Sequence, residues 1–444
     1  MIQPSRTLSL WTLVVFGVGL MAPIIVLGTF GILAQASAGH APLSYVVALA
    51  AMLPTAISYA QMARAYPLAG SSYTYVRKAI DARLGFLTGW AILLDYLFLP
   101  MAIWLIGTAY LHSAIPAVPE TLWLFAFIGI TTFINVVGLR LAAKLNIVLV
   151  ALQVLVMAAF IVLCVHYVML GSTRPIFSLA PLDPQGARWP LILGGAAIAC
   201  YSYLGFDAVS TFTEETRDAV RVVPRAIVLV TLIGGLIFIS TAYFVQLAHP
   251  SFEFADADSA ASEIALRIGG DAFAFIFLIG LVIGQFASGI AAQASVSRLL
   301  YALGRDAVLP RRVFGHLSER FGTPVYAIGL CALVALLALR LDVTTSTSFI
   351  NFGAFLTFML VNLSVVFHYW RRQGLRGAKA AFWYLACPLF GMLADFGLMV
   401  SLDHRALVLG LSWLILGVVY LAFLTGGFRR PPPEMSLAEA TAGV

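Results

Sequence analysis

The stretch SLWTLVVFGVGLMAPIIVLGTFGIL, residues 9–33, decides the fold. It contains no charged side chain, and it is longer than the roughly 20 apolar residues that a helix needs to cross a bilayer. Its middle, GVGLMAP (Gly17 to Pro23), places glycine and proline where a continuous helix favours neither. Freed backbone groups are tolerated at membrane depth only where they are buried in protein or line a cavity. The stretch therefore predicts a spanning helix that is broken beside a cavity.

Similar apolar runs recur along the whole chain. Of 444 residues, 61% are hydrophobic and only 10% are charged, against about 25% charged in soluble domains. We expect an all-α integral membrane protein whose single transporter-sized domain, residues 1–425, has about twelve transmembrane helices. The expected spans lie near residues 9–33, 42–63, 84–112, 120–139, 145–170, 190–213, 224–248, 267–297, 324–340, 346–369, 380–401 and 405–425.

The distribution of basic residues predicts the orientation. With the N-terminus in the cytoplasm, 21 of the 26 Lys and Arg residues fall on the cytoplasmic side of these spans. This is the asymmetry of the positive-inside rule, so both termini are expected in the cytoplasm. The same asymmetry explains the net charge of +6 without a nucleic acid partner. Residues 426–444, rich in proline and polar side chains, are expected to form a disordered cytoplasmic tail.

A second break occurs at YSYLGFD, Tyr201 to Asp207, five helices after the first. Because five is odd, the two broken helices run in opposite directions. This arrangement favours a five-plus-five inverted repeat, with a substrate held at the midplane between the two breaks. Repeat one would cover 9–170, repeat two 190–369, and two extra helices 380–425. The alternative is ordinary close packing of helices through small residues.

Acids inside spans cost at least about 2.5–3.5 kcal/mol at the helix centre, so each needs a reason. Asp207 follows the second break, and Asp95, beside Tyr96, lies halfway along the third span. Either acid is a candidate to bind a substrate ammonium or to carry a coupled proton, and Tyr96 offers a cation–π face. The alternative for each acid is a structural hydrogen-bond network.

Three further acids lie near or outside this predicted core. Asp395, in the eleventh span, is interpreted as structural or near the interface. Glu214 and Glu215 end the sixth span beside several arginines, where they are candidates for an inner gate or simply a solvated helix end.

Motifs of catalysis and cofactor binding are absent from the sequence. We find no HExxH, GxSxG, Walker A loop or dinucleotide fingerprint, and the four cysteines lie singly inside apolar runs. We therefore expect no enzyme, no metal and no cofactor, and secondary rather than ATP-driven transport.

Three long strings resemble the amino acid–polyamine–organocation superfamily, and its bacterial putrescine importers in particular. They are YLGFDAVSTFTEETRDAVRVVPRAI (203–227), SVSRLLYALGRDAVLP (295–310) and INFGAF (350–355). The resemblance implies a leucine-transporter-like fold with broken helices 1 and 6, alternating access, and cation-coupled uptake across a bacterial inner membrane. Carried over residue by residue, it implies that the substrate contacts Gly17, Gly19, Leu20, Met21, Ala22, Pro23, Asp95, Tyr96, Tyr201, Ser202, Gly205, Phe206 and Asp207.

The sequence also departs from the resembled pattern. Gly28 stands where the putrescine subgroup has an acid, so a monoamine that needs one acid stays open beside a diamine. Met21 to Ile24 replace the glycine-serine-glycine carboxylate cradle of the amino acid transporters. Gln153 stands where some relatives have a lysine, and only Ser288 offers a hydroxyl on the eighth span, which leaves proton coupling through Asp207 or Asp95 by elimination.

We therefore expect an importer of a small amine or polyamine, coupled to protons and embedded in lipid. The alternative is a transporter or exchanger of the same fold for an amino acid or another small organic solute.

Overall fold

The computed structural model describes residues 8–68, 71–138, 142–171, 175, 177–183, 188–306 and 308–434, without the side chains of Ser71, residues 142–150 and Glu214. Within this part, the regular structure is helical, and the one β contact is an isolated bridge between Leu8 and Thr216. The helices, with η for 3₁₀ or π turns, are α1 (Leu10–Leu20), α2 (Ile25–Gly28), α3 (Phe30–Ala36), α4 (Ala41–Ala65), α5 (Ser71–Ala79), α6 (Ala82–Ala114), α7 (Glu120–Val137), α8 (Ala142–Gly171), η1 (Ala180–Leu182), α9 (Trp189–Ala199), η2 (Cys200–Tyr203), η3 (Asp207–Glu215), α10 (Ala219–Ala248), η4 (Ala257–Ser259), α11 (Ala260–Arg305), α12 (Arg311–Phe314), α13 (Val325–Ala335), η5 (Leu336–Leu339), α14 (Val343–Val365), η6 (Val366–Arg372), α15 (Ala378–Ala381), η7 (Phe382–Ala386), α16 (Cys387–Val400) and α17 (His404–Leu424).

Most of these helices are membrane spans by length and composition. Among the described residues, eleven segments are long and apolar enough to cross a bilayer. A further apolar helix, Val325–Leu339, is shorter and falls on the expected span 324–340. In lipid, a helix satisfies its own backbone groups, which is why such apolar sequences fold this way. The predicted all-α membrane fold is confirmed, whereas the inverted repeat stays a prediction.

Three helices differ from the sequence-based expectation. α10 begins at Ala219 rather than near 224, and Pro224 lies inside it, in its second turn. α11 extends well beyond 267–297 and has a kink at Gly270, whose φ is 67°. α5 was not expected, because a search for long apolar runs passes over a short helix that carries Arg77 and Lys78.

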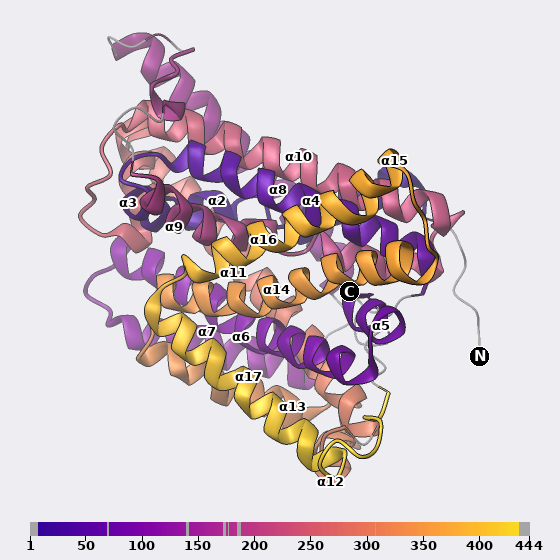
Figure 1. The fold of residues 1–444 in the computed structure, drawn as a ribbon. Helices are drawn as coiled ribbons and strands as arrows, with labels where there is room; N and C mark the ends of the chain where they lie inside the picture. The colour runs from indigo at the N-terminus through magenta and orange to yellow at the C-terminus, as the bar shows by residue number, and fades with distance from the viewer. Residues whose placement is uncertain are drawn as a thin grey trace.

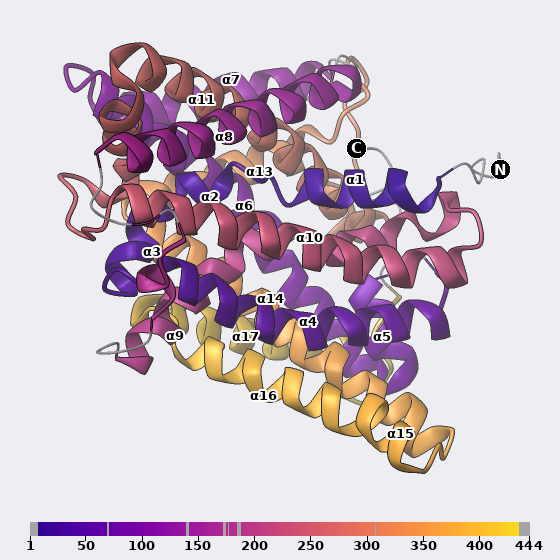
Figure 2. The same cartoon turned by 90° about the horizontal axis from the view of Figure 1, so that it is seen from above.

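Both described ends of the chain lie at one end of the bundle, here called the terminal face (Leu8, α5 and residues 425–434). The backbone N–H of Leu8 donates to the Glu215 carbonyl (3.1 Å), and that of Arg217 donates to the Leu8 carbonyl (3.1 Å). Residues 425–434 turn back over α5, where Arg77 lies 3.4 Å from the carboxylate of Glu434. Figures 1 and 2 show α5 and α15 on this side, and Figure 2 shows α1 reaching it. We expected residues 426–444 to be disordered, and residues 435–444 of this tail lie outside the described part.

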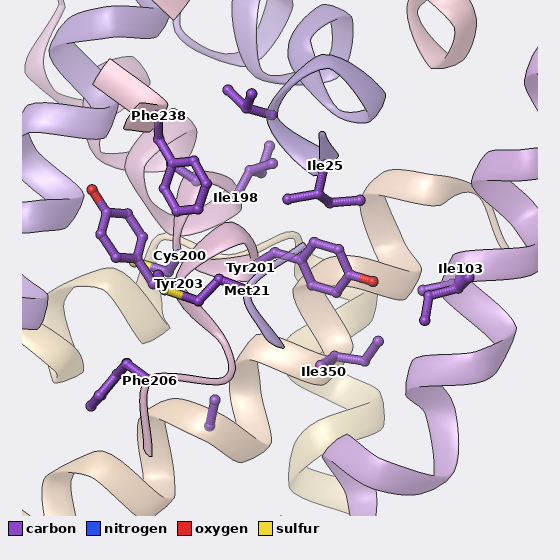
Figure 3. Packing of buried hydrophobic residues seen from close by; sticks show 14 of the residues in the cluster. Met21, Ile25, Ile103, Ile198, Cys200, Tyr201, Tyr203, Phe206, Phe238 and Ile350 are labelled. Carbon is purple, nitrogen blue, oxygen red and sulfur yellow. The ribbon is translucent and has the colours of Figure 1, made fainter. Parts of the chain in front are cut away.

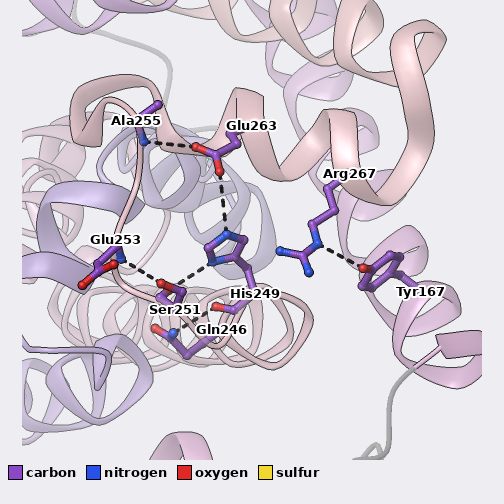
Figure 4. A network of polar contacts seen from close by, with 8 residues as sticks. All are labelled: Tyr167, Gln246, His249, Ser251, Glu253, Ala255, Glu263 and Arg267. Carbon is purple, nitrogen blue, oxygen red and sulfur yellow. Dashed lines mark hydrogen bonds and ion pairs between the residues drawn. The ribbon is translucent and has the colours of Figure 1, made fainter.

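At the opposite face, the connection between α10 and α11 covers α3. The Phe254 ring packs edge-on against Phe30 of α3, with centroids 6.3 Å apart. His249 is buried, with Nδ1 3.0 Å from the Ser251 carbonyl and Nε2 4.0 Å from a Glu263 carboxylate oxygen (Figure 4). Gln246 donates from Nε2 to the His249 carbonyl (3.1 Å). These contacts hold the connection in place over α3.

Candidate functional site

A cavity of about 220 Å³ lies where the two broken segments meet. Its walls come from the break after α1, from α6, α8 and α11, and from the break between η2 and η3. The volume is below the roughly 300–1,000 Å³ of pockets for drug-sized ligands, so it fits a small solute. Of the residues expected from the sequence to bind a substrate, those that line it are Gly19, Leu20, Met21, Ala22, Asp95, Tyr96, Tyr201, Gly205 and Asp207.

The first break exposes backbone to this cavity. Pro23 has no N–H to donate, and Ala22 adopts a left-handed conformation with a φ of 45°. That conformation costs a non-glycine residue roughly 1–2 kcal/mol, so the surrounding packing must hold it. The N–H groups of Met21 and Ala22 close the last turn of α1 on the carbonyls of Gly17 and Gly19. Helix geometry resumes only at Ile25.

The second break touches the first. Gly205 has a φ of +110°, and a Cβ placed on it would lie 3.2 Å from the carbonyl carbon and oxygen of Leu20. Glycine is the residue that permits both this backbone conformation and this approach. Before the break, Tyr201 points toward Ile25 and Ile103 in the cavity wall, whereas Tyr203 turns away toward Phe238 (Figure 3).

Two carboxyls provide the charge of the cavity, Asp95 on α6 and Asp207 at the start of η3. Among the described residues, no lysine, arginine or histidine lines the cavity, and neither acid has an ion pair. Asp95 Oδ1 is buried without a hydrogen-bond partner. The Asp207 carboxyl, in contrast, lies beside the backbone N–H groups at the break, those of Gly205, Asp207 and Ala208. Asp95 is therefore the acid that is freer to bind a ligand.

The wall formed by α8 and α11 is polar but uncharged. Gln153 of α8 and Gln285, Ser288 and Ser295 of α11 line the cavity. The sequence drew attention to Gln153 and Ser288 only in connection with coupling, and it gave no reason to select Gln285. A glutamine inside an apolar run is less conspicuous than a charge, because it costs less to bury.

Four of the residues expected to contact a substrate do not line the cavity. Gly17 packs so closely on Val209 and Val230 that a Cβ there would overlap their side chains. The Ser202 hydroxyl pairs with that of Tyr45 (3.0 Å), and the Phe206 ring packs against Tyr59 and Phe358. The fourth, Pro23, is buried within the break itself.

The remaining acids have other surroundings. The side chain of Glu214 lies outside the described part, and Glu215 contributes its backbone carbonyl to the Leu8 contact. Asp395 is fully buried on α16 and accepts hydrogen bonds from Thr55 (2.9 Å) and Asn362 (3.0 Å). It thus joins α16 to α4 and α14 and does not line the cavity, as expected of a structural acid.

Comparisons with known proteins agree on one family. The model of the family described as amino acid permease matches residues 8–428. The low-affinity putrescine importer PlaP of Escherichia coli (strain K12) is 41% identical over 442 residues, which cover 98% of this chain and 96% of that protein. The branched-chain amino acid permease BcaP of Bacillus subtilis (strain 168) is 26% identical, over 94% of this chain and 92% of that protein.

We expect Gly205→Val to push the two breaks apart, because a side chain at this φ strains the backbone by about 1–3 kcal/mol and its Cβ would lie 3.2 Å from the Leu20 carbonyl. The rate of solute uptake should fall by at least about tenfold. The matched control is Gly194→Val on α9, where the nearest atom to a new Cβ, the Ser401 carbonyl oxygen, is 3.9 Å away. Thermal unfolding in detergent and uptake in proteoliposomes should be measured for both. Wild-type behaviour of both variants would show that the contact is dispensable.

Proposed function

Because this chain belongs to the amino acid permease family, we propose that it is a secondary active transporter that imports a small amine or polyamine by alternating access, with putrescine as the type substrate. Membership makes it a multi-pass membrane permease and not an enzyme. The relative that shares 41% of its residues over almost the whole chain is named as a putrescine importer, which supports the substrate class.

One observation carries the proposal, namely that two acids line the cavity and that no basic side chain of the described residues does. A charge inside a membrane protein needs a partner, and a protonated amine would supply it. Hydrogen bonds to charged groups contribute about 1.5–3 kcal/mol each, more than neutral ones. The rings of Tyr96 and Tyr201 add aromatic surface on which an ammonium group binds favourably. In this proposal, Asp95 binds the ammonium directly and Asp207 adds negative potential.

An amino acid substrate is the second candidate, since a relative is named as a branched-chain amino acid permease. An α-carboxylate would need unused N–H groups at one of the breaks. At the second break, the Asp207 carboxyl already interacts with the N–H groups of Gly205, Asp207 and Ala208. A second carboxylate there would meet like charge instead of donors, so we favour the amine.

We expect Asp95→Asn to raise the KM for putrescine by about 10- to 100-fold, because it removes a charged hydrogen-bond partner worth about 1.5–3 kcal/mol. Asp207→Asn should have the smaller effect on KM, because the Asp207 carboxyl is already used by the backbone. The measurement is saturable uptake of labelled putrescine into proteoliposomes. The control is Asp183→Asn. The Asp183 carboxyl follows η1 and does not line the cavity.

An unchanged KM in Asp95→Asn would contradict the amine site. Saturable uptake of labelled branched-chain amino acids together with no uptake of putrescine would favour the second candidate.

We also infer that uptake is coupled to protons, with Asp95 and Asp207 as the candidate carriers. Neither acid has a cationic partner, so each depends on a substrate or a proton for neutralisation. An inner gate at Glu214 and Glu215 stays a candidate within the same cycle.

An imposed pH gradient, alkaline inside the proteoliposome, should drive accumulation of putrescine above its external concentration. A protonophore should abolish this accumulation but leave exchange of labelled for unlabelled putrescine intact. Accumulation that persists with protonophore and follows a sodium gradient would overturn proton coupling.

We assign the terminal face to the cytoplasm of a bacterial inner membrane, which follows from the positive-inside asymmetry. The cavity extends toward this face through Thr211 and Phe212 of η3, while the connection between α10 and α11 covers α3 at the other face. The structure then corresponds to an inward-facing state of the proposed cycle.

Labelling of single cysteines checks this orientation. In a Cys387→Ser background, Glu253→Cys should react with a membrane-impermeant maleimide added to whole cells, and Glu319→Cys should react only after the cells are opened. Both acids are exposed, and the other three native cysteines are buried. The reverse labelling pattern would invert the assignment.

A further inference from the structure

The part of the cavity wall formed by α8 carries a buried amide group with an unused acceptor. Gln153 of α8 is only 3% exposed and lines the cavity. Its Oε1 has no hydrogen-bond partner among the described residues. An unpaired buried acceptor costs about 1–3 kcal/mol, so the protein gains if a ligand donates to it.

Close packing of α8 on α11 fixes this amide in place. Gly280 and Gly284 form a GxxxG pair, the spacing that lets two membrane helices approach closely. A Cβ on Gly284 would lie 3.0–3.1 Å from Cδ, Cγ and Nε2 of Gln153, and one on Gly280 would lie 2.7 Å from Val156. The amide therefore lies flat on a glycine surface, with little freedom to turn away from the cavity.

A second amide lies beside it. Gln285, next to Gly284 in sequence, is also 3% exposed and lines the cavity. Its Nε2 would be 3.7 Å from a Cβ on Gly28, so it occupies the space beside that glycine. The two acids come from α6 and η3, whereas the two amides come from α8 and α11. The cavity thus has an anionic wall and a neutral amide wall.

We propose that Gln153 and Gln285 form a neutral subsite that binds the far end of the substrate, so that the transporter accepts short chains with an ammonium at one end and any hydrogen-bonding group at the other. An amide presents both a carbonyl acceptor and N–H donors. It can therefore bond to a second ammonium, which only donates, and to a hydroxyl, which donates and accepts. The bond to the hydroxyl is weaker, but the hydroxyl also costs less to remove from water. A methyl end satisfies neither group and leaves the Gln153 acceptor unpaired.

This inference rests on the proposed amine transport and is tested with three chains of equal length. Putrescine, 4-amino-1-butanol and n-butylamine share one ammonium end and differ only at the other. KM and maximal rate for each should be measured in proteoliposomes that contain the full-length protein. We expect similar KM values for the first two and a KM about tenfold higher for butylamine, the difference of one hydrogen bond that becomes buried and unpaired.

Variants at the amide wall identify the residue responsible. Gln153→Leu, close in size but apolar, should bring the three KM values together. It should raise the KM for putrescine and aminobutanol, which lose a hydrogen bond, and lower the KM for butylamine, which no longer leaves a buried acceptor unpaired. Gln153→Glu should lower the KM for putrescine relative to aminobutanol, because a carboxylate distinguishes an ammonium from a hydroxyl. The matched control is Gln35→Leu, which removes an exposed amide on α3 that does not line the cavity.

The outcomes separate this inference from the proposed function. Saturable uptake of all three amines with equal KM values would overturn the amide subsite and leave amine transport standing. A preference for putrescine and aminobutanol that survives in Gln153→Leu and in Gln285→Leu would do the same. Absence of uptake of every amine would overturn the proposed function and the subsite with it. A Leu variant that does not fold is replaced by Gln153→Glu, whose altered ratio of KM values reports on the same contact.

Discussion

The contact between the two helix breaks is the constraint on which the rest of the structure depends. Gly205 combines a φ of +110°, which favours glycine, with an approach to the Leu20 backbone that would leave only 3.2 Å to a Cβ. Two further contacts bind α1 to η3: the Phe16 and Phe212 rings stack 6.2 Å apart, and Leu8 bonds to the backbone at Glu215. Because these contacts join the two half-helices along their length, α1 and η3 form one unit. The cavity lies between this unit and the helices α6, α8 and α11.

Breaking a helix at membrane depth leaves backbone groups that lipid cannot satisfy, and neighbouring helices supply the missing partners. Asn351 on α14 donates to the Ala197 carbonyl just before the second break (2.8 Å). Tyr110 on α6 donates its hydroxyl to the Leu27 carbonyl just after the first break (2.9 Å). The Asp207 carboxyl lies beside the N–H groups at the second break. Some polar residues around the breaks therefore bond to the backbone. The polar groups that do not are left to face a ligand.

How much of this is predictable from the sequence depends on what each feature costs in free energy. Helix breakers and charges inside apolar runs are conspicuous because a membrane penalises them, so the two breaks, Asp95 and Asp207 can be selected, and all of them meet at one cavity. The sequence does not show which way a residue beside a break points, and Gly17 and Phe206 face packing partners instead of the cavity. Gln153 and Gln285 escape notice because an amide is cheaper to bury. Their role depends on the α8–α11 contact at Gly284, which is a tertiary feature.

Charge balance connects this geometry to the proposed transport cycle. Asp95 and Asp207 lie close enough to interact electrostatically, and no basic side chain of the described residues lines their cavity. An empty cavity with two carboxylates is costly to enclose at membrane depth, whereas one neutralised by an amine and a proton, or by a diamine, is not. In the proposed cycle, the charge of the cargo balances the charge of the two acids. Gln153 and Gln285 then add hydrogen bonds without adding charge, so the recognition of the far end of the substrate leaves that balance unchanged.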